Sequence, residues 1–496
     1  MCVSICIIAN KIDNIEKCLS SLKRFKQEIV LVDTGMGKLE DIANKYSCSY
    51  YQFDWCDDFA AARNYAIQKA KYDWIFMIDS DEYVVIGNPM YFFRNNTLTN
   101  TIGKIKRVSF TGEKTAIGKS YEVEARLFSR RYFKYTGRVH EQIIPLNSQV
   151  TGVSYQDSGL EIEHTGYLDK RVLLTKAQRD EQLLKQDLAD KPHDAYLLFQ
   201  MGKALILQPG NEKKAVLYLE NAVTYQQNWQ QPYMYDCITT LLIAYERLNE
   251  QDLLIETALK YTQYFANSTD YYYLVASLLQ LQELYQQAIL YYQKGLSISN
   301  SKYASKNRTN PETWLKITRC YAKLNDIKNT KKYCEKVFEL MTIQQLEQDA
   351  DQFFFAKEYL IASFFYIEEL KRDSSNIRTL QNICRLCQSY IKLGNYAQAL
   401  DAALIFKDDF SIQSDFLFVL GNVYLANKKL DAAKQAFEAT LKYKNSANSG
   451  INSWLTQYNL GIIYEYCGDK TQAIKSYLEC NDYEPAKKRL TYLENK

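Results

Sequence analysis

The stretch from Asp73 to Tyr83 constrains the fold of this chain more than any other. Trp74 to Ile78 is a continuous apolar run, too short for an independent helix and typical of a strand buried on both faces. Asp79, Asp81 and Glu82 follow directly, and three carboxylates at the end of a buried strand repel one another and resist desolvation. A bound cation would relieve that cost, because Mg²⁺ and Mn²⁺ prefer carboxylate oxygens. For an isolated Asp-x-Asp, the alternative is a solvated acidic turn.

The first third of the chain alternates between short apolar runs and helical spacings. Strands are predicted at 3–9, 29–32, 50–53 and 74–78, and helices at about 15–25, 39–46 and 59–70. This alternation predicts a parallel sheet with right-handed crossovers, which is half of a nucleotide-binding α/β domain. Ligands of such sheets bind beyond the carboxyl ends of the strands, where the three acids would lie. Asp13, with Glu16 three residues later, is predicted to cap the first helix.

From Thr101 onward the pattern changes to strand-like segments that no helix of convincing length separates. These segments cover 102–110, 121–130, 138–144 and 160–164. Antiparallel or mixed strands that complete one side of the sheet fit this pattern best.

The remaining two thirds of the chain carry a helical repeat. Small and aromatic residues recur at the same internal intervals in two sets, Gly421, Tyr424, Ala433 and Phe437, then Gly461, Tyr464, Ala473 and Tyr477, with Pro485 closing the second set. Weaker copies pair Gly202 with Ala215, Leu279 with Ala288 and Tyr292, Tyr321 with Cys334, and Tyr390 with Ala399. These are the positions of a tetratricopeptide repeat, in which Gly and Ala let paired helices approach closely. A helical bundle is the alternative.

Length, charge and cysteine content restrict the class of protein. At 496 residues the chain is long enough for two or three domains. The net charge of +3 argues for neither nucleic acid nor a membrane surface, and no apolar run approaches the length of a transmembrane helix. The start, 1–9, is predicted to be a strand rather than a signal peptide, so the 12 cysteines indicate a reducing cytoplasm.

Seven motifs occur in an order and at intervals that resemble a known family. They are Ser4-Ile5-Cys6-Ile7-Ile8-Ala9-Asn10, Val32-Asp33-Thr34-Gly35, Trp55-Cys56-Asp57-Asp58-Phe59-Ala60-Ala61-Ala62-Arg63-Asn64, Asp79-Ser80-Asp81-Glu82, Arg126-Leu127-Phe128, Gly137-Arg138-Val139-His140-Glu141 and His164-Thr165-Gly166-Tyr167. Together they resemble the family 2 glycosyltransferases of the GT-A fold over about 1–167. The closest subgroup fuses that domain to tetratricopeptide repeats and includes peptide glycosyltransferases that modify ribosomally made bacteriocins.

The resemblance implies an α/β plus all-α chain. A GT-A nucleotide-sugar-binding domain would cover 1–170, and a C-terminal tetratricopeptide-like α-solenoid would cover 171–496. Two departures weaken the assignment of nucleotide contacts beyond Asp33 in the loop that follows it. The family usually has Asp-Glu before its second strand, where this chain has Gln27-Glu28. It also commonly follows Asp-Thr-Gly with Ser-x-Asp-Gly-Thr, where this chain has Met36 to Glu40.

The resemblance also implies which residues bind the sugar donor, for which a UDP-sugar is expected. Ala9, Asn10 and Asp33 would lie at the strand ends that hold the nucleotide. Asp79 would face the ribose or the metal. Arg63 would contact phosphate in a bidentate manner or hold the acidic loop in place.

Metal binding and proton transfer are assigned in the same way. Asp81, with Asp79, would hold the Mg²⁺ or Mn²⁺ that clamps the diphosphate, and His164 would supply a nitrogen ligand. His140 and Glu141 stand where such enzymes often place the general base, so Glu141 would take the acceptor's proton and the anomeric centre would invert. A structural role is the alternative for each histidine.

The function predicted from these residues is that of a metal-dependent inverting glycosyltransferase. Its acceptor would be a Ser, Thr or Cys side chain of a peptide or protein, such as a bacteriocin precursor, held by the repeats, which also offer a surface for a homodimer. A glycan or cell-surface polymer is the rival acceptor. A sugar-phosphate nucleotidyltransferase would carry an N-terminal Gly-rich signature with an Arg, which 1–22 lacks. A repeat scaffold with a decayed transferase domain is the non-enzymatic alternative.

Overall fold

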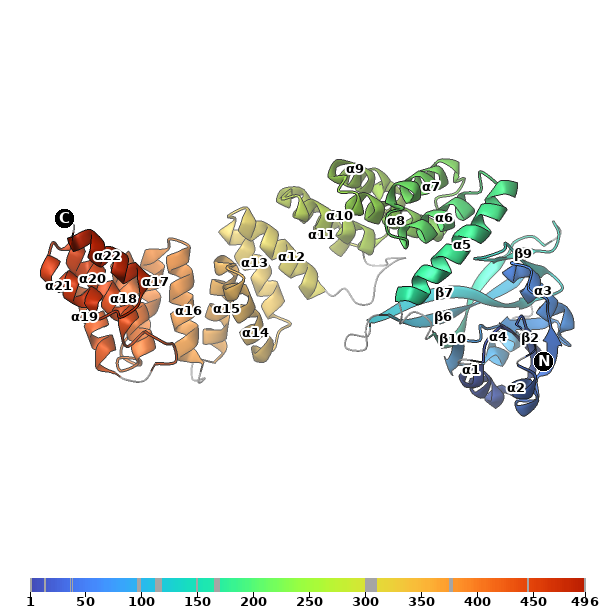
Figure 1. Cartoon of the computed structure of the whole chain (residues 1–496), viewed down its shortest axis with the longest axis horizontal. Coiled ribbons are helices and arrows are strands. Elements are labelled where there is room, and N and C mark those ends of the chain that lie inside the picture. Colours follow the sequence, from blue (N-terminus) through green and yellow to red (C-terminus); the bar gives the residue numbers. More distant parts are fainter. Residues whose placement is uncertain are drawn as a thin grey trace. The chain divides into compact units, whose positions relative to one another are not determined.

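The computed structural model describes residues 2–12, 15–35, 37, 39–95, 100–111, 118–148, 150–164, 170–298, 310–373, 378–443 and 446–494. It divides into two compact units, Met1–Tyr264 and Phe265–Lys496, which we describe separately (Figure 1). The predicted helix cap at Asp13 and the motif residues 165–167 lie outside the described residues. The continuous helical region that follows the last strand begins at Lys170, whereas the first unit extends to Tyr264. The domain boundary at residue 170 therefore stays a prediction.

In the described part of the first unit, eight strands form one mixed sheet. In spatial order they are β3 (Ser49–Gln52), β2 (Glu28–Asp33), β1 (Val3–Ala9), β4 (Trp74–Met77), β7 (Gly118–Ser129), β6 (Thr101–Thr111), β10 (Ser154–His164) and β5 (Glu82–Ile86). β1 pairs in parallel with β2 and β4, and β2 in parallel with β3. β7 pairs antiparallel with both β4 and β6, so the predicted parallel half and the mixed second half are confirmed.

Helices cover both faces of this sheet. α1 (Ile15–Leu22), α2 (Glu40–Lys45) and α4 (Pro89–Asn95) pack on one face, and α3 (Phe59–Lys69) packs on the other. A short 3₁₀ turn, Lys23–Phe25, follows α1. Alternate residues of β1 pack on opposite faces of the sheet. Ile5 and Ile7 belong to the core under α1, α2 and α4, whereas Cys6 belongs to the core under α3. Burial on both faces explains why these strands read as continuous apolar runs.

One predicted strand is wrong in its first half. The segment predicted as a strand over 138–144 is a loop up to residue 141, followed by β9 (Gln142–Pro145), which pairs with β8 (Phe133–Thr136). The backbone conformation gives the reason. Gly137 has φ 98° and His140 has φ 52°, and a positive φ is incompatible with an extended strand. We refer to residues 137–141 as the 137–141 loop.

The rest of the first unit is helical. Its helices are α5 (Lys170–Asp190), α6 (Ala195–Ile206), α7 (Glu212–Tyr225), α8 (Tyr233–Arg247) and α9 (Gln251–Tyr261), followed by a 3₁₀ turn, Thr262–Phe265. Gly202 of α6 shows why a small residue recurs in the repeat, because a Cβ there would lie 2.5 Å from the Leu219 side chain and 3.3 Å from the Ala215 carbonyl oxygen. The two helices therefore pack closer than a larger residue allows.

The second unit is built from further helices, most of which pack in pairs along the chain. They are α10 (Thr269–Leu281), α11 (Tyr285–Leu296), α12 (Asn310–Lys323), α13 (Ile327–Phe338), α14 (Ile343–Phe355), α15 (Tyr359–Arg372), α16 (Thr379–Lys392), α17 (Tyr396–Ile405), α18 (Ser414–Ala426), α19 (Leu430–Lys442), α20 (Trp454–Tyr466), α21 (Lys470–Leu478) and α22 (Glu484–Glu494). The predicted repeat positions meet as expected. A Cβ at Gly421 would lie 2.6 Å from the Phe437 ring, and one at Gly461 would lie 2.5 Å from the Tyr477 ring. No helix in the described ranges is long and apolar enough to cross a membrane.

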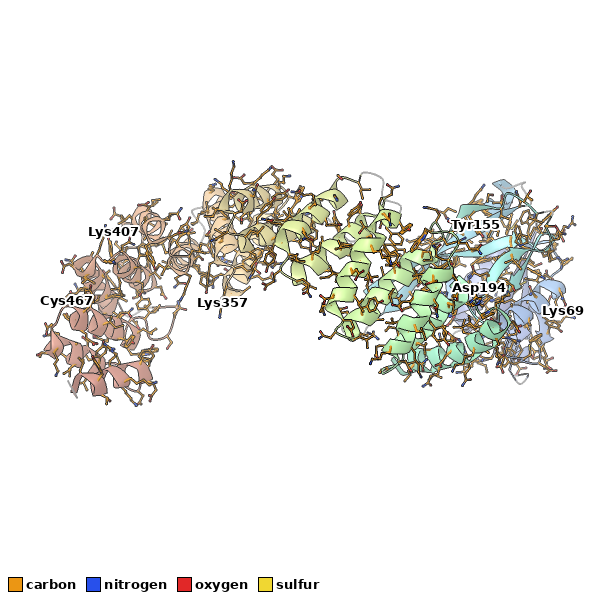
Figure 2. All side chains as sticks on the ribbon, turned by 90° about the horizontal axis from the view of Figure 1, so that it is seen from above. Lys69, Tyr155, Asp194, Lys357, Lys407 and Cys467 are labelled. Atoms are coloured by element: carbon orange, nitrogen blue, oxygen red, sulfur yellow. The ribbon has the colours of Figure 1, made fainter. Side chains whose placement is uncertain are left out.

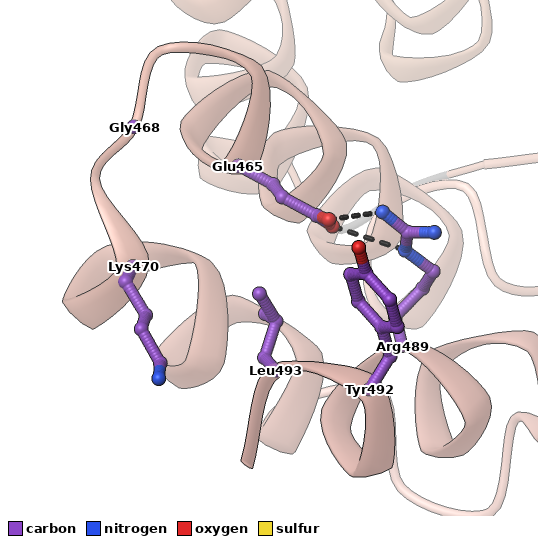
Figure 3. Close-up of a pocket in the computed structure, with 6 residues that line it drawn as sticks. All are labelled: Glu465, Gly468, Lys470, Arg489, Tyr492 and Leu493. Atoms are coloured by element: carbon purple, nitrogen blue, oxygen red, sulfur yellow. Dashed lines mark hydrogen bonds and ion pairs between the residues drawn. The ribbon is translucent and has the colours of Figure 1, made fainter. Parts of the chain in front are cut away.

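A pocket of about 260 Å³ lies among the last helices of the second unit (Figure 3). The Glu465 carboxylate on its wall is paired with the Arg489 guanidinium, at 3.0 Å for the Nε contact, and it accepts a hydrogen bond from the Tyr477 hydroxyl at 2.9 Å. Because its main charged groups already satisfy one another, we interpret this pocket as a packing gap between α20 and α22.

Candidate active site

The turn after β4 places the three predicted carboxylates at the carboxyl edge of the parallel strands. The Ile78 N–H donates to the Cys6 carbonyl of β1 at 3.1 Å, and the chain then turns. The Glu82 N–H donates to the Asp79 carbonyl, and the Asp79 N–H donates to Oε2 of Glu82, both at 3.0 Å. Glu82 is therefore folded back beneath the turn and is fully buried, while Asp79 and Asp81 are half-buried. Asp79 and Glu82 share one partner, since Nη2 of Arg126 contacts both carboxylates, whereas Asp81 contacts His164 instead.

Asp79 is held between two arginines. Arg63 Nη2 lies 2.8 Å from Oδ1 of Asp79, and Arg126 Nη2 lies 2.9 Å from Oδ2. Burial alone raises the pKa of the Asp79 carboxyl, but the guanidinium groups of Arg126 and Arg63 outweigh burial and hold this pKa well below its usual range. These two arginines supply the positive charge that a carboxylate needs at the end of a buried strand.

Arg63 reaches this position through the local packing of α3. The Asp58 carboxylate caps the helix by accepting the Ala61 N–H at 2.8 Å. Ala62 and Ala66 are buried, and small residues there let the helix lie close to the sheet. Arg63 therefore projects towards the turn after β4 with its side chain only 9% exposed.

Three further residues extend this network, although no role is predicted for them from the sequence: Arg126, Arg107 and Glu124. Arg126 also pairs with Glu124 and, at 3.2 Å, with Glu82, while Arg107 lies 2.8 Å from Glu124. Burial raises the pKa of Glu82, and Arg126 offsets this only in part. A signal was present in the sequence, because Glu122, Glu124 and Arg126 alternate along β7 and residues two apart share one face of a strand.

Asp81 and His164 form the second half of the site. His164 Nε2 lies 3.2 Å from Oδ2 of Asp81, and its other ring nitrogen lies 3.5 Å from the Ser109 hydroxyl on the neighbouring strand β6. His164 is buried, whereas the Asp81 side chain is 33% exposed. Burial raises the pKa of Asp81, but the hydrogen bond and charge of His164 outweigh burial and lower it.

This pair is the part of the site that suits a divalent metal. Across the described residues, no group of three or more His, Cys, Asp or Glu side chains is arranged to hold a metal ion. Mg²⁺, however, is usually held by one or two carboxylates together with substrate phosphates. Asp81 and His164 offer one oxygen and one nitrogen ligand at a partly open position, so they fit a metal whose remaining ligands come from a bound diphosphate. Asp79 is turned to the arginines instead.

The predicted nucleotide residues lie at the ends of β1 and β2. Ala9 is buried and its carbonyl accepts the Thr34 N–H at 2.8 Å, while Asn10 is exposed. The Asp33 side chain is engaged within the protein. Its Oδ1 accepts the Gly35 N–H at 2.7 Å, and its Oδ2 accepts the Leu39 N–H at 3.2 Å and the Tyr50 hydroxyl at 3.0 Å. Asp33 thus orders the loop after β2, and Asn10 is the residue of the three that faces solvent.

His140 and Glu141 lie in the 137–141 loop and face different partners. The Glu141 carboxylate forms an ion pair with Nε of Arg63, the same arginine that binds Asp79. His140 instead faces α5, with its Nε2 3.6 Å from Oδ2 of Asp180. Burial lowers the pKa of His140, and Asp180 offsets this only in part. Glu141 therefore lies next to Arg63, which also binds Asp79, whereas His140 lies against α5.

Comparisons with known proteins agree with this architecture. Residues 4–111 match the family described as Glycosyl transferase family 2, and residues 269–302, 414–446 and 456–487 match the tetratricopeptide repeat. A TPR repeat-containing protein of Synechococcus elongatus is 28% identical over 269 residues, which are 51% of this chain and 64% of that protein. The SPbeta prophage-derived glycosyltransferase SunS of Bacillus subtilis is 27% identical over 276 residues, which are 52% of this chain and 62% of SunS. Both alignments cover less than two thirds of the relative's own length.

Similarity to solved structures is weaker. The crystal structure of MamA protein superposes with a TM-score of 0.26 and 17% identity, over 31% of this chain and 81% of that one, and a score this low carries no argument. This chain combines a glycosyltransferase family 2 domain with tetratricopeptide repeats.

Proposed function

We propose that this protein is a metal-dependent inverting glycosyltransferase that moves a sugar from a nucleotide sugar to a peptide or protein side chain. The observation that carries the proposal is the turn after β4, where Asp81 lies 3.2 Å from His164 at the carboxyl edge of the parallel strands. Ligands of α/β sheets bind at that edge. The family 2 match over residues 4–111 includes Asp79 and Asp81.

The donor side of the site follows from these positions. Asn10 is exposed at the end of β1, and Asp33 orders the loop after β2. These positions support our proposal that the nucleotide binds there, and we propose a UDP-sugar as the donor. Asp81 and His164 would hold a Mg²⁺ or Mn²⁺ ion, which, when bound, neutralises charge on the departing diphosphate. Arg63 and Arg126 keep Asp79 ionised and fix the turn that presents Asp81.

The acceptor side is assigned to Glu141. One guanidinium, that of Arg63, contacts both Asp79 and Glu141, so the two carboxylates lie within the span of a single side chain. A carboxylate this close to the donor turn is placed to take the proton of an attacking hydroxyl, which gives inversion in one step. A Cys acceptor needs less help, because a thiol ionises more readily than a hydroxyl. His140 contacts Asp180 on α5, and we assign it no role in proton transfer.

A peptide or protein acceptor, such as a bacteriocin precursor, is proposed because of the repeats. Helical repeats form extended surfaces that commonly bind a polypeptide. More than half of the described chain is the helical region from α5 to α22, which contains three tetratricopeptide matches and which chemistry on a small sugar does not require. A glycan or cell-surface polymer acceptor is the second candidate within the same reaction class.

Incubation of the purified full-length chain with Mn²⁺ or Mg²⁺ and a panel of nucleotide sugars tests the proposal. Release of a nucleoside diphosphate from one donor, and a mass increase of one hexose on a peptide acceptor, are the expected results. Transfer to a glycan but not to any peptide would move the acceptor to the second candidate. Failure to bind any nucleotide sugar would contradict the proposal and favour a repeat scaffold with an inactive transferase domain.

A further inference from the structure

The 137–141 loop is held by helices that lie outside the residues matched to the family 2 domain. The Arg138 N–H donates to Oδ2 of Asp187 on α5 at 2.9 Å, and the Arg138 side chain reaches the same carboxylate at 3.3 Å. The Arg138 carbonyl accepts the Phe59 N–H at the start of α3 at 2.8 Å. The loop is therefore connected on one side to α5 and on the other side to the helix that carries Arg63.

A second contact comes from α6. The Tyr196 hydroxyl donates to the His140 carbonyl at 3.4 Å and accepts a hydrogen bond from the Gln142 side chain at 2.8 Å. Gln142 Nε2 also donates to the His140 carbonyl at 3.1 Å. Tyr196 itself is fixed because Asp194, which is labelled in Figure 2, caps α6 by accepting the Tyr196 N–H at 3.0 Å. The peptide group that precedes Glu141 is thereby anchored to α6.

An apolar core joins the same elements. Val139 is 5% exposed and shares a cluster with residues of α5 and α6, namely Leu183, Leu184, Leu197, Met201, Ala204, Leu205 and Ile206. Polar contacts and apolar packing thus act on three consecutive residues, Arg138, Val139 and His140. The His140 backbone is in the left-handed region, which is unfavourable for a residue with a side chain and persists only when its surroundings impose it. The left-handed turn allows His140 to face Asp180 while Glu141 faces Arg63.

We propose that α5 and α6 are part of the catalytic unit, with Asp187 and Tyr196 as positioning residues that set the place of the Glu141 carboxylate. The proposal rests on the role of Glu141 proposed above. Asp187 fixes the loop three residues before Glu141, and Tyr196 fixes the carbonyl of the residue next to it. Neither side chain contacts the Asp79–Asp81 turn in any described interaction, so their effect on turnover passes through the loop.

The test compares four variants of the full-length chain. Asp187→Ala removes the acceptor for the Arg138 N–H, Asp187→Asn keeps an amide oxygen for it, and Tyr196→Phe removes one hydroxyl while keeping the ring. Asp190→Ala, an exposed residue at the end of α5, is the matched control. Turnover, the KM for the nucleotide sugar, the melting temperature and amide hydrogen exchange over residues 138–142 are measured for each.

Asp187→Ala is expected to lower kcat by about 10- to 100-fold with an unchanged donor KM, because a displaced catalytic group costs rate rather than donor binding. Asp187→Asn should keep most of the wild-type kcat. Tyr196→Phe should lower kcat several-fold at an unchanged melting temperature. Asp187→Ala and Tyr196→Phe should each speed amide exchange in the 137–141 loop. If Asp187→Ala and Tyr196→Phe both keep the turnover and the amide exchange of the wild type, the proposal is overturned. A loss of turnover in Asp190→Ala equal to that in Asp187→Ala would also overturn it.

Two further outcomes remain decisive. If Asp187→Ala does not fold, Tyr196→Phe alone decides the proposal, since loss of one hydroxyl leaves the aromatic packing of Tyr196 with Phe199 and Tyr233 in place. If the wild-type chain has no activity with any donor, the proposed function fails. Amide exchange in the loop then still tests whether α5 and α6 hold it.

Discussion

Truncation before α5 should destabilise the transferase domain, although residues 1–170 include every predicted catalytic and donor-binding residue. Removal of α5 and α6 exposes Val139, which is 5% exposed in the full chain, and burial of a Val side chain is worth about 1.5–3 kcal/mol. It also removes the hydrogen bond from the Arg138 N–H to the Asp187 carboxylate, a charge-assisted contact worth about 1.5–3 kcal/mol. The sum, about 3–6 kcal/mol, is a large part of the 5–15 kcal/mol that typically stabilises a domain.

The matched comparison is between fragments 1–170 and 1–264, because the second ends where the first compact unit ends. With a urea m-value of about 2 kcal/mol per molar, the predicted loss lowers the unfolding midpoint of the transferase sheet by about 1.5–3 M. Urea titration monitored by amide exchange in β1 and β4 follows that sheet specifically. Equal urea midpoints for fragments 1–170 and 1–264 would refute the reasoning, whether or not the two fragments also hydrolyse the donor at equal rates.

The remaining predictions concern single side chains. EDTA and Asp81→Asn should each abolish transfer without unfolding the protein, and full activity of a chelated sample would contradict the metal assignment. Glu141→Gln should lower turnover by about 10²- to 10⁴-fold while donor binding, measured by calorimetry, persists; an equal loss of donor affinity would move Glu141 to nucleotide binding. Arg126→Met leaves the carboxylates of Asp79 and Glu82 without a main partner and should cost about 3–5 kcal/mol in urea unfolding at pH 7, so a wild-type midpoint would show that the network contributes little. Because the folded-state pKa of Asp79 is lowered, its contribution is complete well above the unfolded value of about 3.9 and is lost as pH falls, so the stability difference between wild type and Arg126→Met should shrink between pH 7 and pH 3.

The sequence by itself determined the elements that depend on local patterns. Apolar runs buried on both faces predict β1, β2 and β4, and the recurrence of Gly421 and Gly461 at one interval predicts the helix pairs in which these glycines meet Phe437 and Tyr477. Both signals depend on residues close together in the chain. The nearness of Asp81 to His164 was expected only from family resemblance, because these residues are 83 positions apart and meet through the pairing of β10 with β5.

Only the tertiary structure decided how the charges of the site are paired. Arg126 meets Asp79 because β7 lies beside β4 in the sheet, and no local pattern specifies that neighbour. The left-handed conformation of His140, and with it the separation of His140 from Glu141, depends on contacts with α5 and α6 that follow 40 to 60 residues later in the chain. The spacing of apolar residues along a chain indicates which face of a helix or strand is buried. The identity of the partner that buries it is set by packing between distant segments, and that packing determines which acid faces an arginine and which remains open to a ligand.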